Sequence, residues 1–203
     1  SGYFSDNREA VEQDLGGGSS YFGPSSKNSI PKNSEILFGH VLKTHFETRK
    51  PLVLVGHSKG AAEILHMVLD HPDLIFEGLV EQVILIKAAI QGSPIANDPG
   101  RWIGYEAIRG LMELETETLS ESGANLVFNA AFDRYQGKLD DSEHDFISNR
   151  IFYVRSAEIT ENFSYCVQLI LGITQHKPEQ YDQNDGMISV TSQLDERIGV
   201  DLG

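Results

Sequence analysis

The sequence predicts an α/β fold, in which helices flank a parallel β-sheet. Three short apolar runs, at 51–55, 82–86 and 150–155, have the composition of buried strands. Helical patterns lie between these runs, and this alternation is typical of parallel sheets because a parallel crossover needs a long connection. A third observation is a Gly-x-Ser-x-Gly turn at 56–60, which stands directly between the first strand and a helix.

Local signals predict the N-terminal elements. A capping pattern at 5–9 indicates a short helix that ends before the glycines at 16–18. Residues 19–22 are a weak candidate for a strand. Ser29, with a proline two positions later, marks the start of a helix that reaches about residue 48 and carries apolar side chains along one face.

The central elements follow from the apolar runs. Residues 51–55 are wholly apolar, and we expect a strand that is buried on both faces. The turn at 56–60 leads into a buried helix at 61–69. Two further strands are expected at 82–86 and 150–155, which gives the order strand, helix, strand that parallel sheets require.

Residues 99–148 lie between the second and third expected strands and differ from the rest of the chain. They are richer in acidic residues and carry two apolar stripes with helical spacing. We therefore expect an insertion that folds over a core formed by 1–98 and 149–203. The acids at 140–145 lack the alternating ligands and central glycine of a calcium loop, which favours a solvated surface over a metal site.

Composition excludes several classes of protein. The chain has 203 residues, with 30 Asp and Glu against 16 Lys and Arg, so its formal net charge is −14. This charge argues against nucleic acid or an anionic membrane surface as a partner, because both attract basic surfaces. Cys166 is the only cysteine, so no intrachain disulfide can form.

The sequence also bears on location. No apolar run reaches the roughly 18 residues that a membrane-spanning helix needs. No signal peptide is visible, which slightly favours a cytoplasmic protein. A secreted protein that has lost its signal would look the same, so both locations remain open.

Ser58, at the centre of the turn, is the candidate nucleophile. A serine hydroxyl becomes reactive when a tight turn exposes it beside a base and near donors for an oxyanion. The strand–turn–helix context predicts such a nucleophile elbow, and an ordinary glycine-rich turn is the alternative. Gly56 and Gly60 would permit the turn, because a side chain at either position would collide with the strand or the helix. The backbone N–H of Lys59, at the helix N-terminus, would be one oxyanion donor.

Residues 51–60, followed by 90–98, resemble the α/β-hydrolase superfamily and, more narrowly, bacterial triacylglycerol lipases and lipase-like esterases. In these enzymes an Asn-Asp-Gly segment carries the acid of the catalytic triad, and residues 183–188 match it. The resemblance therefore implies that Asp185 is the triad acid. A plain Asn-Asp-Gly turn is the alternative.

The resemblance further implies that the backbone N–H of Tyr3 is the second oxyanion donor. The base is where this sequence departs from the family, because no histidine follows Asp185. We therefore expect the chain to be a fragment, with the histidine outside it. Alternatively, His176 acts as the base and Glu158 as the acid. His57, inside the turn, is expected to be a structural neighbour of the site.

The activity that the resemblance implies is hydrolysis of carboxylic esters through an acyl-enzyme on Ser58. Residues 99–148 would then be a lid over a small-molecule or lipid-like ester. This chemistry needs no cofactor, and the sequence does not indicate an oligomeric state. The rival hypothesis is a catalytically silent module of the same fold that serves in binding or assembly.

Overall fold

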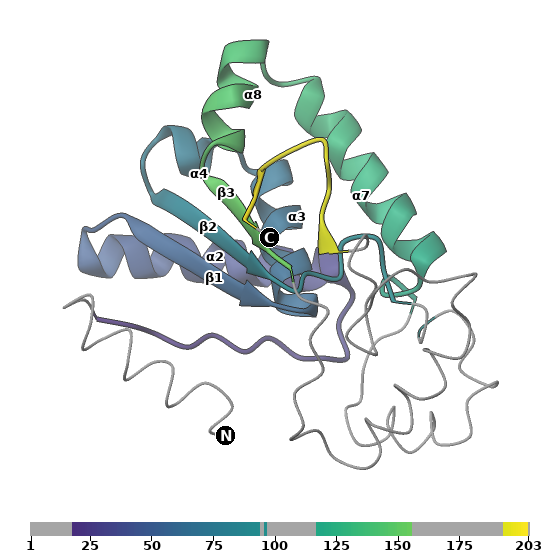
Figure 1. The fold of residues 1–203 in the computed structure, drawn as a ribbon. Coiled ribbons are helices and arrows are strands. Elements are labelled where there is room, and N and C mark those ends of the chain that lie inside the picture. The colour runs from purple at the N-terminus through teal and green to yellow at the C-terminus, as the bar shows by residue number, and fades with distance from the viewer. Residues whose placement is uncertain (1–17, 94–95, 97–116, 156–192, 203) are drawn as a thin grey trace.

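The computed structural model describes residues 18–93, 96, 117–155 and 193–202. These residues form a four-stranded sheet and the helices that cover it (Figure 1). The strand order is β1-β2-β3-β4, and every neighbouring pair is parallel. The predicted parallel sheet flanked by helices is therefore confirmed. The strands are β1 (Leu52–His57), β2 (Val80–Ile86), β3 (Ile151–Val154) and β4 (Val200–Asp201).

Helix α3 is the central helix of the described structure. It packs against β1 and β2, and α2 and α7 each pack against it (Figure 1). Its side chains are buried along almost the whole helix, and the buried set includes the polar residues Lys59, Glu63 and His66. The helices are α2 (Ile30–Thr48), α3 (Lys59–Asp70), α4 (Asp73–Phe76), α7 (Glu121–Gln136) and α8 (Asp141–Ser148).

The predicted start of the long N-terminal helix is correct. The Ser29 side chain caps α2 by accepting a hydrogen bond from the backbone N–H of Lys32. The helix ends at Thr48 because Arg49 adopts a left-handed conformation, with φ 56°.

Two expectations about the elements need correction. Residues 19–22 form no strand; Phe22 instead stacks on His40 of α2, with ring centroids 4.3 Å apart. Strand β1 is not buried on both faces, since Val53 and Val55 are 51% and 59% exposed. The described helices cover only the opposite face of β1, where Leu54 packs against the core.

The described part of the expected insertion forms α7 and α8. Four side chains of α7 belong to the same hydrophobic core as α3: Phe128, Ala131, Phe132 and Tyr135. The acids at 140–145 begin α8, where Asp140 and Glu143 form a capping box. Residues 97–116 lie outside the described residues, so the lid stays a prediction.

None of the described helices is both long enough and apolar enough to cross a bilayer. Within the described ranges there is also no cluster of three or more His, Cys, Asp or Glu side chains that could hold a metal ion.

Candidate active site

Ser58 is the single residue between the end of β1, at His57, and the start of α3, at Lys59. Its backbone has φ 55° and ψ −124°, a conformation that residues with a side chain rarely adopt. Such strain persists only where the surrounding structure imposes it, and it concentrates at functional sites. The Ser58 side chain makes no capping hydrogen bond to α3, so its hydroxyl is not used to cap the start of the helix. These are the features of a nucleophile elbow.

Backbone hydrogen bonds hold the strained residue from both sides. The Ser58 N–H donates to the carbonyl of Ile86, at the end of β2, over 3.0 Å. The Ser58 carbonyl accepts from the N–H groups of Ala61 and Ala62 in α3, and from that of Ala89 after β2. The turn is thus tied to the neighbouring strand as well as to its own helix, which is how its strain is sustained.

The two glycines of the turn have different roles. A Cβ atom on Gly56 would lie 2.7 Å from the Cα of Ala61, closer than such atoms approach. A Cβ on Gly60 would meet nothing within 4 Å. The prediction that both glycines avoid a collision is therefore right for Gly56 and wrong for Gly60. The close approach is between the end of β1 and the first turn of α3, and Gly60 lies past that point.

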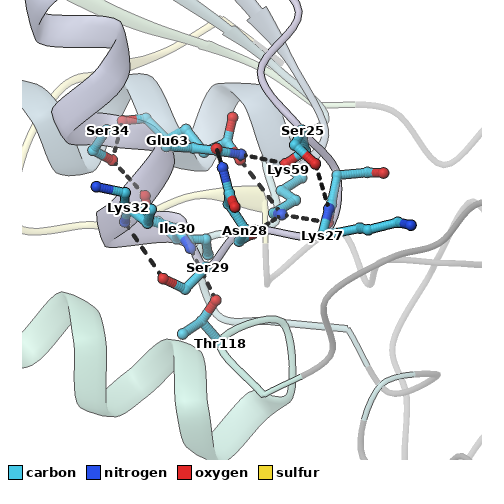
Figure 2. Close-up of polar contacts among 12 residues, drawn as sticks. Ser25, Lys27, Asn28, Ser29, Ile30, Lys32, Ser34, Lys59, Glu63 and Thr118 are labelled. Atoms are coloured by element: carbon cyan, nitrogen blue, oxygen red, sulfur yellow. Dashed lines mark hydrogen bonds and ion pairs between the residues drawn. The ribbon is translucent and has the colours of Figure 1, made fainter.

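Lys59 is the first residue of α3, so its backbone N–H lies at the helix N-terminus, where the helix dipole favours negative charge. Its side chain, however, is buried, with only 11% exposed. The Lys59 ammonium donates to the carbonyls of Ser26 and Asn28, and it lies 3.6 Å from a carboxylate oxygen of Glu63 (Figure 2). The turn at residues 56–60 is therefore connected to the loop that precedes α2.

Glu63, one turn further along α3, is buried as well. Its carboxylate accepts a hydrogen bond of 2.6 Å from the Asn33 side chain of α2. Burial raises the pKa of Glu63, while the Asn33 hydrogen bond and the Lys59 charge act in the opposite direction. Sequence reasoning missed this group; the spacing of Lys59 and Glu63, which brings i and i+4 together on a helix, was the available signal.

The carboxyl ends of the strands meet at one edge of the sheet, because all the strands are parallel. His57 of β1 is in register with Ile86 of β2, and Ile86 is in register with Val154 of β3. An ion pair between Arg155 and Asp201 joins the ends of β3 and β4 at the same edge. In open α/β sheets, ligands bind outside this edge. Ser58 follows directly after β1 and so belongs to it.

Four of the predicted site residues lie outside the described residues: Tyr3, Glu158, His176 and Asp185. The structure brings Ser58 and the Lys59 N–H together, since they are adjacent at the turn. Among the described residues, no histidine side chain is hydrogen-bonded to the Ser58 hydroxyl. In chain order, Glu158, His176 and Asp185 all fall between β3 and β4.

Comparison with solved structures identifies the fold. The mature form of the Bacillus licheniformis lipase BlEst2 is 15% identical, with a TM-score of 0.66 over 87% of this chain and 66% of that one. The propeptide form of the same lipase is 17% identical, with a TM-score of 0.62 over 87% of this chain and 36% of that one. The metagenomic carboxyl esterase MGS0156 is 20% identical, with a TM-score of 0.61 over 98% of this chain and 56% of that one.

The chain therefore has an α/β-hydrolase fold of the kind found in bacterial lipases and esterases. It spans between about a third and two thirds of the lengths of these three structures. No family model matches the chain. No curated protein sequence gives a significant match either.

Proposed function

We propose that this protein is a serine hydrolase of carboxylic esters, of the lipase or esterase type. The observation that carries the proposal is the strained Ser58 between a parallel strand and a helix N-terminus. On a lipase-like α/β-hydrolase fold, this is the place and the conformation of a nucleophilic serine.

The proposed reaction begins when the Ser58 Oγ attacks the ester carbonyl carbon and passes its proton to a base. The carbonyl oxygen becomes an oxyanion, which the Lys59 N–H and a second N–H, from Tyr3, would hold. Collapse of this intermediate expels the alcohol, which takes the proton back from the base. Water then attacks the acyl carbon while the same base removes its proton. The bond between this carbon and the Ser58 Oγ breaks, Oγ takes the proton back from the base, and the carboxylic acid is released.

We propose Asp185 as the acid that orients the base. Asp185 follows β3 and precedes β4, and no histidine lies between Asp185 and β4. The chain order Ser, Asp, His would therefore place the histidine after β4. Residues that follow a parallel strand emerge at the same edge of the sheet as Ser58, which supports this position for the base. The alternative assigns His176 as the base and Glu158 as the acid.

The proposed substrate is a small-molecule or lipid-like ester, with residues 99–148 as a lid above the site. The reaction needs no cofactor. The net charge of −14 disfavours nucleic acid as a partner.

The second candidate is a silent binding or assembly module, favoured by the lack of a described histidine bonded to Ser58. A fluorophosphonate probe, which reacts with activated serines, separates the two. We expect the full-length protein to be labelled and Ser58→Ala to remain unlabelled, with mass spectrometry locating the adduct on Ser58. A folded full-length protein that is not labelled would overturn the proposed function. Labelling that persists in Ser58→Ala would overturn the assignment of the nucleophile.

A further inference from the structure

A buried ion pair lies directly beside the candidate nucleophile. Lys59 and Glu63 face one another across one turn of α3, with side chains 11% and 4% exposed. Removing two charges from water is costly unless good hydrogen bonds compensate. Packing alone therefore does not explain why two charged residues occupy these positions, because apolar residues would pack α3 equally well.

Three oxygen atoms surround the Lys59 ammonium, two of them accepting its hydrogen bonds and one, on Glu63, forming an ion pair at 3.6 Å. These are the carbonyls of Ser26 and Asn28 and the carboxylate of Glu63. The two carbonyls belong to the loop before α2, more than thirty positions away in the chain. The side chain thus clamps the N-terminus of α3 to this loop.

Glu63 is itself held in place by α2. Asn33, which is 1% exposed, donates one hydrogen bond to Glu63 and another to the carbonyl of Ser25. The hydroxyl of Ser34 donates to the backbone carbonyl of Glu63 over 2.8 Å. Loop 25–29, the first turn of α2 and the first turn of α3 therefore form one buried polar network (Figure 2).

The network ends on the residue whose N–H is the proposed oxyanion donor. An oxyanion donor is effective only if it is held within a fraction of an ångström of its place in the transition state. The neighbouring Ser58 is strained, so the turn would relax if its flanking contacts were removed. Because Glu63 neutralises the ammonium, the pair contributes little net charge at the site and acts through geometry.

We propose that Lys59 is a positioning residue for the reaction proposed above: its side chain, clamped to Ser26, Asn28 and Glu63, holds the Lys59 N–H and Ser58 in their reactive arrangement. The inference rests on the proposed function. Lys59 is thus not a substrate ligand through its ammonium, and its loss should lower the rate of chemistry and leave substrate binding unchanged.

The test is the double variant Lys59→Met/Glu63→Gln in the full-length protein, which removes the clamp without leaving a buried lone charge. With a p-nitrophenyl ester as substrate, we expect kcat to fall by about 10- to 100-fold and KM to change by less than threefold. The rate of fluorophosphonate labelling should fall in parallel with kcat. Circular dichroism and thermal unfolding establish that the variant is folded.

The matched control is Lys32→Met/Glu35→Gln, which makes the same substitutions in an exposed ion pair of α2, 3.2 Å apart. We expect its kcat and its labelling rate to equal those of the wild type. Lys59→Gln/Glu63→Gln also leaves no buried charge, but it keeps hydrogen-bond donors at the clamp and should give a kcat between those of the wild type and Lys59→Met/Glu63→Gln. It also supplies the test if Lys59→Met/Glu63→Gln does not fold.

The outcomes distinguish a failure of this inference from a failure of the proposed function on which it rests. A wild type that is folded and unlabelled overturns both. A labelled wild type with kcat unchanged in Lys59→Met/Glu63→Gln, or in Lys59→Gln/Glu63→Gln if only that variant folds, overturns the positioning role alone. A rise in KM with unchanged kcat also overturns it, because Lys59 would then act in substrate binding.

Discussion

Ser58 occupies a backbone conformation that costs free energy, and its neighbours hold it there. Its φ of 55° and ψ of −124° lie where glycine is comfortable and other residues are not. Its backbone nevertheless makes hydrogen bonds to Ile86, Ala61 and Ala89, which would be lost if the turn relaxed. A serine that is kept under strain against this cost is best explained by a function of its hydroxyl.

The strain at Ser58 predicts a difference between two inactive variants. Ser58→Gly should have a larger free energy of unfolding than Ser58→Ala, by about 1 kcal/mol. Glycine relieves the strain, and this relief exceeds the extra entropy that glycine gains in the unfolded chain. Denaturant unfolding of the two variants measures the difference. Equal stabilities would mean that the turn is not strained.

Gly56 and Gly60 offer a matched pair of substitutions at the same turn. Gly56→Ala places a Cβ 2.7 Å from the backbone of Ala61, so we expect a loss of about 1–3 kcal/mol in the free energy of unfolding and slower labelling of Ser58. Gly60→Ala meets open space and should leave both quantities near their wild-type values. Equal effects at the two positions would contradict the close approach of β1 and α3.

Helix α7 illustrates how an element is held by a single face. Helix α7 buries Phe128, Phe132 and Tyr135 in the core, while Leu126 on the same helix is 73% exposed. Phe128 also meets the ring of His66 of α3 edge to face, with centroids 6.0 Å apart. The second half of the expected insertion therefore contributes to the same core as α3.

Truncation of α7 side chains should have very unequal effects. Phe128→Ala removes a side chain that is 1% exposed and should cost about 3–5 kcal/mol of unfolding free energy. Leu126→Ala, two positions away, should change it by less than about 0.5 kcal/mol. Urea unfolding of both variants provides the measurement. Similar losses would mean that α7 does not pack on α3 through this face.

Acid stability belongs to the whole molecule, and His66 is one of its determinants. Burial lowers the pKa of His66 below its ordinary value, although Asp70, 3.4 Å away, acts in the opposite direction. Arg134 of α7 and the adjacent His71 add to the lowering. The folded protein therefore binds a proton at His66 less readily than the unfolded chain does.

It follows that the free energy of unfolding should fall as the pH drops below about 6.5, the ordinary pKa of histidine. The stability that neutral His66 provides is present above that pH and is lost as the pH falls through its lowered pKa. His66→Leu should show a smaller loss between pH 6.5 and 5, measured by urea unfolding at a series of pH values. Parallel curves for the variant and the wild type would contradict this assignment.

The sequence predicted β1, β2 and β3 because these strands are short apolar runs bounded by glycine, proline and charged residues. It did not predict β4, whose two residues, Val200 and Asp201, form no such run. It also predicted the start of α2, since Ser29 and the following proline act locally. It did not predict the exposed face of β1, because a run of Val and Leu looks the same whether one face or both are covered. The capping role of Asp140 was likewise hidden among acids that looked like a solvated surface.

At the candidate site, the sequence by itself determined Ser58 as the nucleophile candidate, with Lys59 beside it, because the signal is carried by five consecutive residues. The tertiary structure decided that Gly56 is required and Gly60 is not, and that Lys59 is clamped to a loop by Ser26, Asn28 and Glu63. These features depend on distances between segments that are remote in the chain. Local propensity and spacing do not encode such distances, which are set only when the core brings α2, α3 and β1 together.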